Sequence, residues 1–196
     1  MYRVKQKDLM ELIKGRRSVR CWSARDVELE KLEHIIVAGM YAPSACNSQK
    51  TRILTVKGKE VIAIICENSA PWFRKVHPPV VIAVLFDLEK PHPLGFNLAL
   101  SHPWSRFIWQ DTACAMMSMM LIAESLGLRT CWQSVEPKEL SRKEFAIRQV
   151  LNITDRYLLA CLLFVGYSDD EPDIKTHRHY GVAIKRSRAE FEINFE

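Results

Sequence analysis

Several signatures of well-known enzyme sites are missing from this sequence. With only 7 glycines in 196 residues, it has no glycine-rich phosphate loop and no dinucleotide fingerprint, so a Rossmann-type site is not expected. It has no nucleophile elbow, and its 6 histidines do not fall at i, i+4 beside a glutamate. His177 and His179 stand two residues apart without further ligands, so no metal site is expected. Any chemistry is therefore expected to belong to a bound cofactor.

Signals for secretion, disulfides and nucleic-acid binding are also missing. The 6 cysteines form no CxxC pair, and several lie in apolar runs, where cysteine behaves as a small hydrophobic residue. Residues 1–17 are charged throughout and contain no apolar signal-peptide core. The net charge is only +5, and no basic run exceeds the pair at 16–17. We therefore expect a cytoplasmic protein with free thiols and no nucleic-acid partner.

The stretch 105–128 is the element around which the rest of the chain is organised. Residues 113–123 are apolar except for Ser118, and their alanines, methionines and leucines are strong helix formers. A helix that is apolar all round has no face for water, so it should lie inside the domain or a subunit interface. The run is too short to span a membrane, which takes about 20 residues. Its four methionines are either plain core or a soft surface against a partner or flat ligand.

The remaining periodicity predicts an α+β protein with a mixed sheet around this buried helix. Helices are expected at 8–14, 26–40 and 137–151, the last with Phe145 on its apolar face, and strands at 52–56, 80–86, 129–135 and 157–167. The run 80–86 is continuously apolar, which predicts a strand covered on both faces. Segment 59–67 fits either a strand or a helix. The stretch 87–104 has the length of a lid or binding loop.

Three polar groups are candidates for a binding site. Residues 16–20 hold three arginines and a serine, which would suit a phosphate, or form a solvated charge cluster. Residues 42–49 are small or amide-bearing, and form either a loop that a flat ligand can approach or a simple turn. Residues 175–178 form a late basic cluster. Together the three groups suit a ligand with a phosphate at one end and a flat heterocycle at the other.

The sequence resembles the FMN-dependent nitroreductase family. The similarity rests on R-R-S-V-R at 16–20, A-P-S-A-C-N-S-Q at 42–49, A-E-S-L-G-L-R-T-C-W at 123–132 and L-F-V-G-Y at 163–167, in family order. After Gln49 this chain has lysine and threonine, where the family often has proline and an aromatic residue.

The resemblance implies a nitroreductase-like homodimer. Its mixed, mainly antiparallel sheet would be surrounded by helices, and two FMN sites would lie at the subunit interface. We expect one FMN-binding domain over 1–196. The tail at about 181–196 alternates apolar and acidic residues near its end, and is expected to pair with or cross the partner subunit.

The resemblance also implies which residues hold FMN. Those expected at the phosphate and ribityl end are Arg16, Ser18 and Arg20, with Arg17 adjacent, and the late basic residues Arg178 and Lys175. Those expected to border the isoalloxazine from the partner chain are Pro43, Ser44 and Asn47, with Gln49 near them. Finally, Gln133 and Ser134 fall where the family brings its backbone to flavin N5.

The implied activity is ping-pong transfer of hydride from NAD(P)H through flavin N5 to a nitroaromatic, quinone or similar small acceptor. Because the flavin carries the redox chemistry, no catalytic side chain is required. Acceptor choice is expected to depend on the 87–104 loop. The alternative is a flavin-binding or interaction module on the same scaffold, with little or no turnover.

Overall fold

The computed structural model describes residues 9–73, 77–94, 105–135 and 142–170, and its centre is one four-stranded sheet. The strands are β1 (Thr51–Val56), β2 (Val80–Asp87), β3 (Arg129–Ser134) and β4 (Tyr157–Gly166). They lie in the order β1-β2-β4-β3, and all neighbouring pairs are antiparallel. Among the described residues, parallel pairing is limited to an isolated bridge between Ser18 and Thr130.

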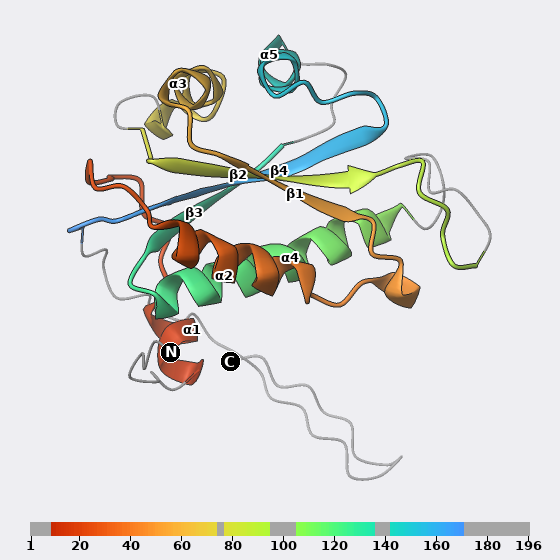
Figure 1. The fold of residues 1–196 in the computed structure, drawn as a ribbon, viewed down its shortest axis with the longest axis horizontal. Coiled ribbons are helices and arrows are strands. Elements are labelled where there is room, and N and C mark those ends of the chain that lie inside the picture. Colours follow the sequence, from red (N-terminus) through yellow and green to blue (C-terminus); the bar gives the residue numbers. More distant parts are fainter. Residues whose placement is uncertain (1–8, 74–76, 95–104, 136–141, 171–196) are drawn as a thin grey trace, which may run out of the picture.

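Helices cover both faces of the sheet. They are α1 (Leu9–Gly15), α2 (Leu29–Met40), α3 (Lys59–Glu67), α4 (Arg106–Ser125) and α5 (Arg142–Val150), with short 3-10 turns at Ala45–Asn47 and Pro71–Phe73. Figure 1 shows α3 and α5 on one face and α2 and α4 on the other, with α1 packed against α4. No helix in this described part of the chain is long and apolar enough to cross a membrane.

The two central strands confirm the prediction drawn from continuous apolar runs. Every residue of β2 is buried, and β4 is buried from Leu158 to Gly166. Since helices lie on both faces, neither set of alternating side chains meets water, and both must be apolar. On the α3 and α5 side, the ring of Phe73 stacks on that of Phe164, with 4.0 Å between centroids.

The ambiguous segment 59–67 is helix α3. Its buried residues are Ile62, Ile65 and Cys66, which is the spacing of one helical face rather than the alternation of a strand. Helix α2 begins at Leu29, three residues later than predicted, with Glu28 as its N-cap. Both differences show that a short apolar run does not by itself define the backbone period or the boundary of an element.

Two helices are less buried in the single chain than their apolar patterns suggest. Helix α4 is predicted to lie inside the domain or a subunit interface, and α1, α2 and the sheet leave part of its surface exposed. Met116 and Met119 are fully buried there, whereas Met117 is 36% exposed. In α5, the apolar face was predicted to include Phe145 and Ile147; Ile147 is buried as predicted, but Phe145 is half-exposed and the neighbouring Glu144 is buried.

Candidate cofactor-binding site

The arginine-rich segment 16–20 runs along the outer edge of β3. The backbone N–H of Val19 donates to the carbonyl of Thr130 at 3.0 Å, and this pairing holds the segment in an extended form. Val19 is buried, while Ser18 and Arg20 on either side of it are exposed. Because side chains alternate along an extended chain, the segment anchors itself through Val19 and leaves Ser18 and Arg20 exposed on either side.

Two arginines of this segment have different partners. The Nη1 group of Arg17 donates to the carbonyl oxygens of Lys14 and Arg16, so this side chain folds back over the last turn of α1. The Nη1 group of Arg20 donates to the Ser18 carbonyl at 3.2 Å, and its guanidinium lies 5.5 Å from the centroid of the Trp72 ring. The structure therefore directs Arg20 outward and turns Arg17 back on its own segment.

The thiol of Cys131 lies close to this segment. Burial raises the pKa of Cys131, while the charges of Arg20 and Arg16 and a hydrogen bond with the Ser18 side chain act in the opposite direction. Ser18, Arg16 and Arg20 thus converge around one position on β3. The raised pKa keeps the thiol protonated near neutral pH, so Cys131 has the character of a packing residue rather than a nucleophile.

A pocket of about 600 Å³ lies beside Arg20 and the end of β3. We call it the sheet-edge pocket, and its lining includes Arg20, Trp72, Gln133 and Ser134. The side-chain oxygen of Gln133 accepts the backbone N–H of Ala70 at 3.0 Å, which ties β3 to the turn after α3. The amide of Gln133 therefore orders the wall of the pocket.

The backbone of β3 offers hydrogen-bonding groups at the edge that faces away from β4, which we call its free edge. Thr130 uses its carbonyl there to bind Val19, whereas Val135 donates its N–H to Ala160 on the opposite side, at 3.1 Å. Successive residues of a strand point their backbone groups to opposite sides, so Ser134, like Thr130, faces the free edge. The Ser134 backbone is thereby aimed away from β4, at the end of β3 that lines the sheet-edge pocket.

Sequence reasoning missed one wall of the sheet-edge pocket. The turn after α3 contributes Asn68, Ser69, Ala70, Trp72 and Phe73. The sequence pattern does not decide between a helix and a strand for segment 59–67. The position in the fold of the residues that follow it could therefore not be predicted. The available signal was a turn-forming sequence followed by Trp72, a large aromatic side chain that is 54% exposed.

The 42–49 loop is ordered by the carboxylate of Asp111 on α4. One oxygen of Asp111 accepts the N–H of Ala45 at 2.8 Å, and the other accepts the hydroxyl of Ser48 at 3.4 Å. Burial raises the pKa of Asp111, and these two hydrogen bonds oppose that rise. A charged anchor from a different element distinguishes this loop from a simple turn.

Within the loop, side chains bond to each other and to the backbone. The hydroxyl of Ser44 accepts the N–H of Gln49 at 3.0 Å, and the amide of Gln49 donates to the Asn47 side chain at 3.2 Å. Cys46, Asn47 and Gln49 all have φ near +50°, a left-handed conformation that is uncommon outside glycine. The loop therefore holds a strained but well-supported backbone, as is frequent at binding sites.

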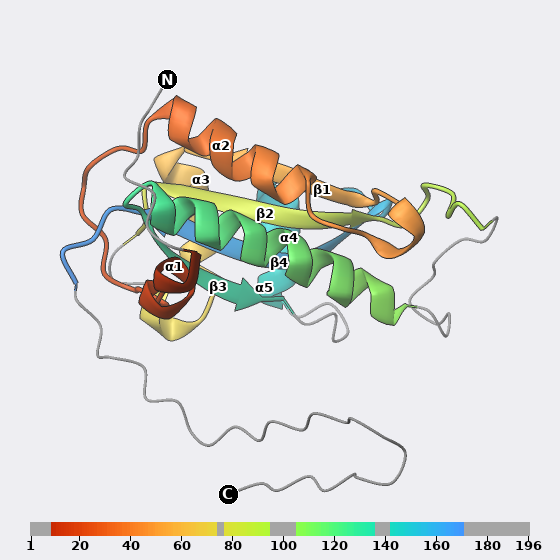
Figure 2. The same ribbon diagram turned by 90° about the horizontal axis from the view of Figure 1, so that it is seen from below.

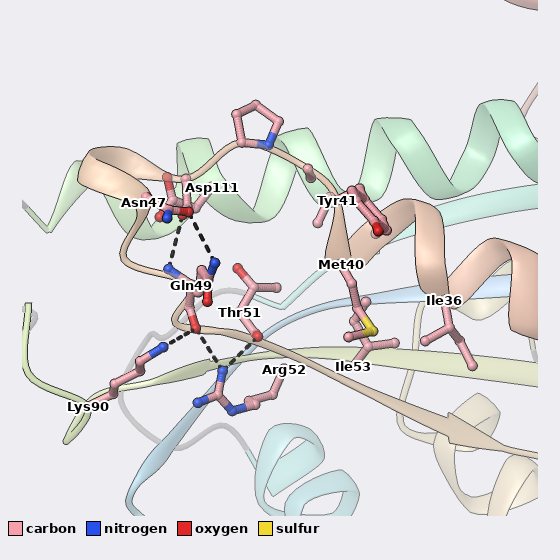
Figure 3. A pocket seen from close by; sticks show the side chains of 15 residues that line it. Ile36, Met40, Tyr41, Asn47, Gln49, Thr51, Arg52, Ile53, Lys90 and Asp111 are labelled. Atoms are coloured by element: carbon pink, nitrogen blue, oxygen red, sulfur yellow. Dashed lines mark hydrogen bonds between the residues drawn. The ribbon is translucent and has the colours of Figure 1, made fainter.

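This loop borders a second pocket of about 740 Å³, which we call the loop pocket (Figure 3). Its lining includes the predicted residues Pro43, Ser44, Asn47 and Gln49. The two pockets share no lining residue. In a single chain, the predicted residues of the 42–49 loop are thus separated from Arg20, Gln133 and Ser134, which line the sheet-edge pocket. Lys175 and Arg178 lie outside the described residues. Among the described residues, no group of three side chains could hold a metal ion.

The fold and these two polar groups define a nitroreductase-like α+β protein. An antiparallel sheet lies between two helical layers, with arginines along one edge strand and an amide-rich loop after α2. The family model described as the Nitroreductase family matches residues 13–167. The chain therefore belongs to the nitroreductase family.

Relatives from several organisms agree with this assignment. A protein of Archaeoglobus fulgidus, to which NADH dehydrogenase/NAD(P)H nitroreductase activity is attributed, is 28% identical over 166 residues, covering 85% of this chain and 88% of its own. A protein of Methanothermobacter thermautotrophicus with the same attribution is 30% identical over 170 residues, covering 87% and 82%. The solved FMN-dependent nitroreductase of Clostridium difficile R20291 superposes with a TM-score of 0.71 at 26% identity, covering 85% and 91%.

Proposed function

We propose that this chain is an FMN-dependent NAD(P)H oxidoreductase that reduces a nitroaromatic, quinone or similar small acceptor. The observation that carries the proposal is the sheet-edge pocket, where Arg20 and the backbone at the end of β3 come together. Its volume of about 600 Å³ is in the usual range for cofactor sites. Bound FMN would supply the redox chemistry, accepting hydride from NAD(P)H and passing electrons to the acceptor in a separate half-reaction.

The residues around the sheet-edge pocket suit FMN in charge and hydrogen-bonding capacity. In our proposal, Arg16, Ser18 and Arg20 hold the phosphate and ribityl end, because guanidinium and hydroxyl donors match phosphate oxygens. Arg17 orders the segment by donating to the carbonyls of Lys14 and Arg16. We extend the phosphate site to Lys175 and Arg178 by family pattern.

The backbone at the end of β3 is proposed to contact the redox end of the cofactor. Ser134 presents its backbone at the free edge, and Gln133 keeps that edge ordered through its bond to Ala70. Flavin N5 needs a nearby hydrogen-bonding group but no acidic or basic side chain, so a backbone contact is sufficient. In this proposal, the chain supplies no catalytic side chain of its own.

We further propose that the active form is a homodimer. Helices α2 and α4 form one layer, which Figure 2 shows face-on, and this layer carries exposed apolar side chains: Val37 and Met40 on α2, Tyr41 at its C-cap, and Cys114 and Met117 on α4. Exposed apolar surface of this kind marks an interaction site. A two-fold interface would let each chain add its 42–49 loop to the other chain's cofactor, which accounts for two separate pockets. The tail at about 181–196 is proposed to cross to the partner.

The experiment that tests the proposal is a visible absorption spectrum of the purified protein. We expect a flavin band that bleaches under anaerobic NADPH or NADH and returns when a nitroaromatic or quinone is added. A flavin band that neither nucleotide bleaches would indicate the flavin-binding module instead. A colourless protein that takes up no FMN on incubation would contradict the proposal.

A further inference from the structure

We propose that Arg52 and Lys90 form a binding site for an oxyanion at the Gln49 end of the loop pocket. This inference rests on the proposed function, because it identifies the substrate class that the pocket accepts. The oxyanion would be a carboxylate on an aromatic acceptor or a phosphate of the nicotinamide dinucleotide. These two sources share the same chemistry, and the experiment below separates them.

The geometry brings two cations to one backbone oxygen. The carbonyl oxygen of Gln49 accepts from Arg52 Nη1 at 2.8 Å and from Lys90 Nζ at 2.9 Å (Figure 3). Arg52 Nη1 also donates to the Thr51 carbonyl at 3.1 Å. Both cationic side chains line the loop pocket. Arg52 lies on β1 and Lys90 in the bend that follows β2, and the backbone carbonyl of Gln49 in the 42–49 loop holds them side by side.

Within the described part of the chain, both cations keep unused hydrogen-bond donors. The described bonds of Arg52 go to the Gln49 and Thr51 carbonyls and, at 3.3 Å, to Asp87. A guanidinium has about five N–H donors and an ammonium about three, so each side chain retains donors beyond these contacts. An oxyanion with two or more oxygen atoms could accept from both side chains at once.

Positive charge exceeds negative charge around this point. The buried carboxylate of Asp87 is already bound by Arg156, at 2.8 Å from Nη2, as well as by Arg52. Lys50 is completely buried close by, and its ammonium has no hydrogen-bond partner among the described residues. Lys90 forms no ion pair within the described part of the chain, and its ammonium donates to the neutral carbonyl of Gln49. Such a concentration of like charge is costly unless an anion joins it.

The two remaining acids near the pocket do not neutralise this cluster. Glu89 is largely exposed and approaches Arg156 only at 4.0 Å. Asp111 lines the same pocket, but its oxygens are bound to Ala45 and Ser48. Within the described part of the chain, neither of these two acids forms an ion pair with Arg52 or Lys90.

The rest of the loop pocket indicates what carries the anion. Its lining includes the apolar side chains of Ile36, Met40, Ile53 and Ala115. A flat aromatic ring could lie on these side chains and direct an anionic substituent toward Arg52 and Lys90. The predicted ligand is thus an aromatic compound with a carboxylate or phosphate group.

The test compares Lys90→Met with Lys90→Arg in the purified protein, with Lys59→Met as the matched control. Lys59 is an exposed lysine at the start of α3 and lines neither pocket. Calorimetry would measure the binding of benzoate against benzamide, and of adenosine 2′-phosphate against adenosine. We expect Lys90→Met to weaken binding of one anionic probe about tenfold, with the neutral probes unaffected. Lys90→Arg and Lys59→Met should bind like the wild type.

The two sources of the anion give different results in this experiment. Loss confined to benzoate assigns the site to the acceptor, and loss confined to adenosine 2′-phosphate assigns it to the nucleotide. With flavin turnover present, the KM of the matching charged substrate should rise in parallel. Equal binding of both anions by wild type and Lys90→Met would overturn the inference. Because binding is measured without turnover, this outcome is distinct from a failure of the proposed enzymatic function.

Discussion

Lys50 is a lysine without exposure to water and, among the described residues, without a hydrogen-bond partner for its ammonium. Its ring contact with Phe86, at 5.5 Å from the centroid, offers only partial compensation. Burial lowers the pKa of Lys50 from its ordinary value of 10.5, although the nearby Asp87 opposes this shift. A buried unpaired charge is destabilising, so this residue reduces the stability of the fold.

We predict that Lys50→Met stabilises the protein by about 1–3 kcal/mol near neutral pH. Methionine keeps most of the buried volume and removes the charge. The pKa of Lys50 is lower in the folded protein than in the unfolded chain. Between these two pKa values, the unfolded chain binds a proton that the folded protein lacks. Wild-type stability should therefore rise with pH up to about 10.5, and the variant should lack this contribution.

Urea unfolding midpoints at two pH values would check this prediction. The exposed Lys59→Met variant is the control, and should change stability by less than about 0.5 kcal/mol. A lower midpoint for Lys50→Met would mean that the ammonium has a favourable partner in the folded protein.

At the phosphate site, we predict that Arg16→Ala weakens FMN binding by about 1.5–3 kcal/mol, the range for a hydrogen bond to a charged group. Arg16 is partly buried beside β3, where it influences the Cys131 thiol together with Arg20. Fluorescence titration of the apoprotein with FMN would measure the change. Lys59→Ala removes the same charge away from both pockets and should leave the affinity unchanged. Equal affinities for Arg16→Ala and wild type would refute the role given to Arg16.

At the scale of elements, helix α4 has two different faces. Met116 and Met119 pack into the core, whereas Met117 is 36% exposed and Cys114 is also exposed. The apolar composition of this helix is therefore only partly explained by the fold of one chain. A second copy of the chain covering the exposed face would explain the rest.

We predict that Met117→Glu disrupts the homodimer and the retention of FMN together, because it places a charge in the proposed interface. Sedimentation and the flavin absorbance of the purified protein would measure the two effects. The control is Ile64→Glu on α3, since Ile64 is similarly exposed, at 38%, but lies on the opposite helical layer. A Met117→Glu protein that remains dimeric, or a monomer that still retains FMN, would contradict the shared-site proposal.

At the scale of the whole molecule, the proposed site depends on assembly. The arginine segment 16–20 and the 42–49 loop line different pockets of one chain. If a cofactor joins the two groups across an interface, then folding, dimerisation and cofactor binding are thermodynamically linked. The stability of the protein should then depend on both FMN and protein concentration.

We predict that FMN at 100 times its Kd stabilises the apoprotein by about 2.7 kcal/mol. Thermal unfolding of the apoprotein, at several protein concentrations with and without FMN, would measure this effect. The Tm of the apoprotein should rise with its concentration if dimerisation stabilises the fold. Riboflavin is the control ligand, and should stabilise less at equal concentration because it lacks the phosphate. A Tm that FMN leaves unchanged would be incompatible with the linkage.

Much of the architecture could be predicted from the residues themselves. The continuous apolar runs of β2 and β4 predicted buried central strands, and the apolar stretch of α4 predicted the central helix. Local signals did not decide whether 59–67 was a strand or a helix, and they placed Phe145 rather than Glu144 in the core. Those assignments depend on which side of a helix the sheet covers, and that information lies in distant parts of the chain.

The sequence by itself determined the four strands, the helices other than α3, the two polar motifs and the family to which the chain belongs, because these follow from local pattern. Only the tertiary structure decided that Asp111 orders the 42–49 loop, that Gln133 ties β3 to Ala70, and that Lys90 and Arg52 meet at one oxygen. It also showed that the predicted site residues lie at two separate pockets. These relations join residues far apart in the chain, and only packing of the sheet against its helices determines which side chains meet.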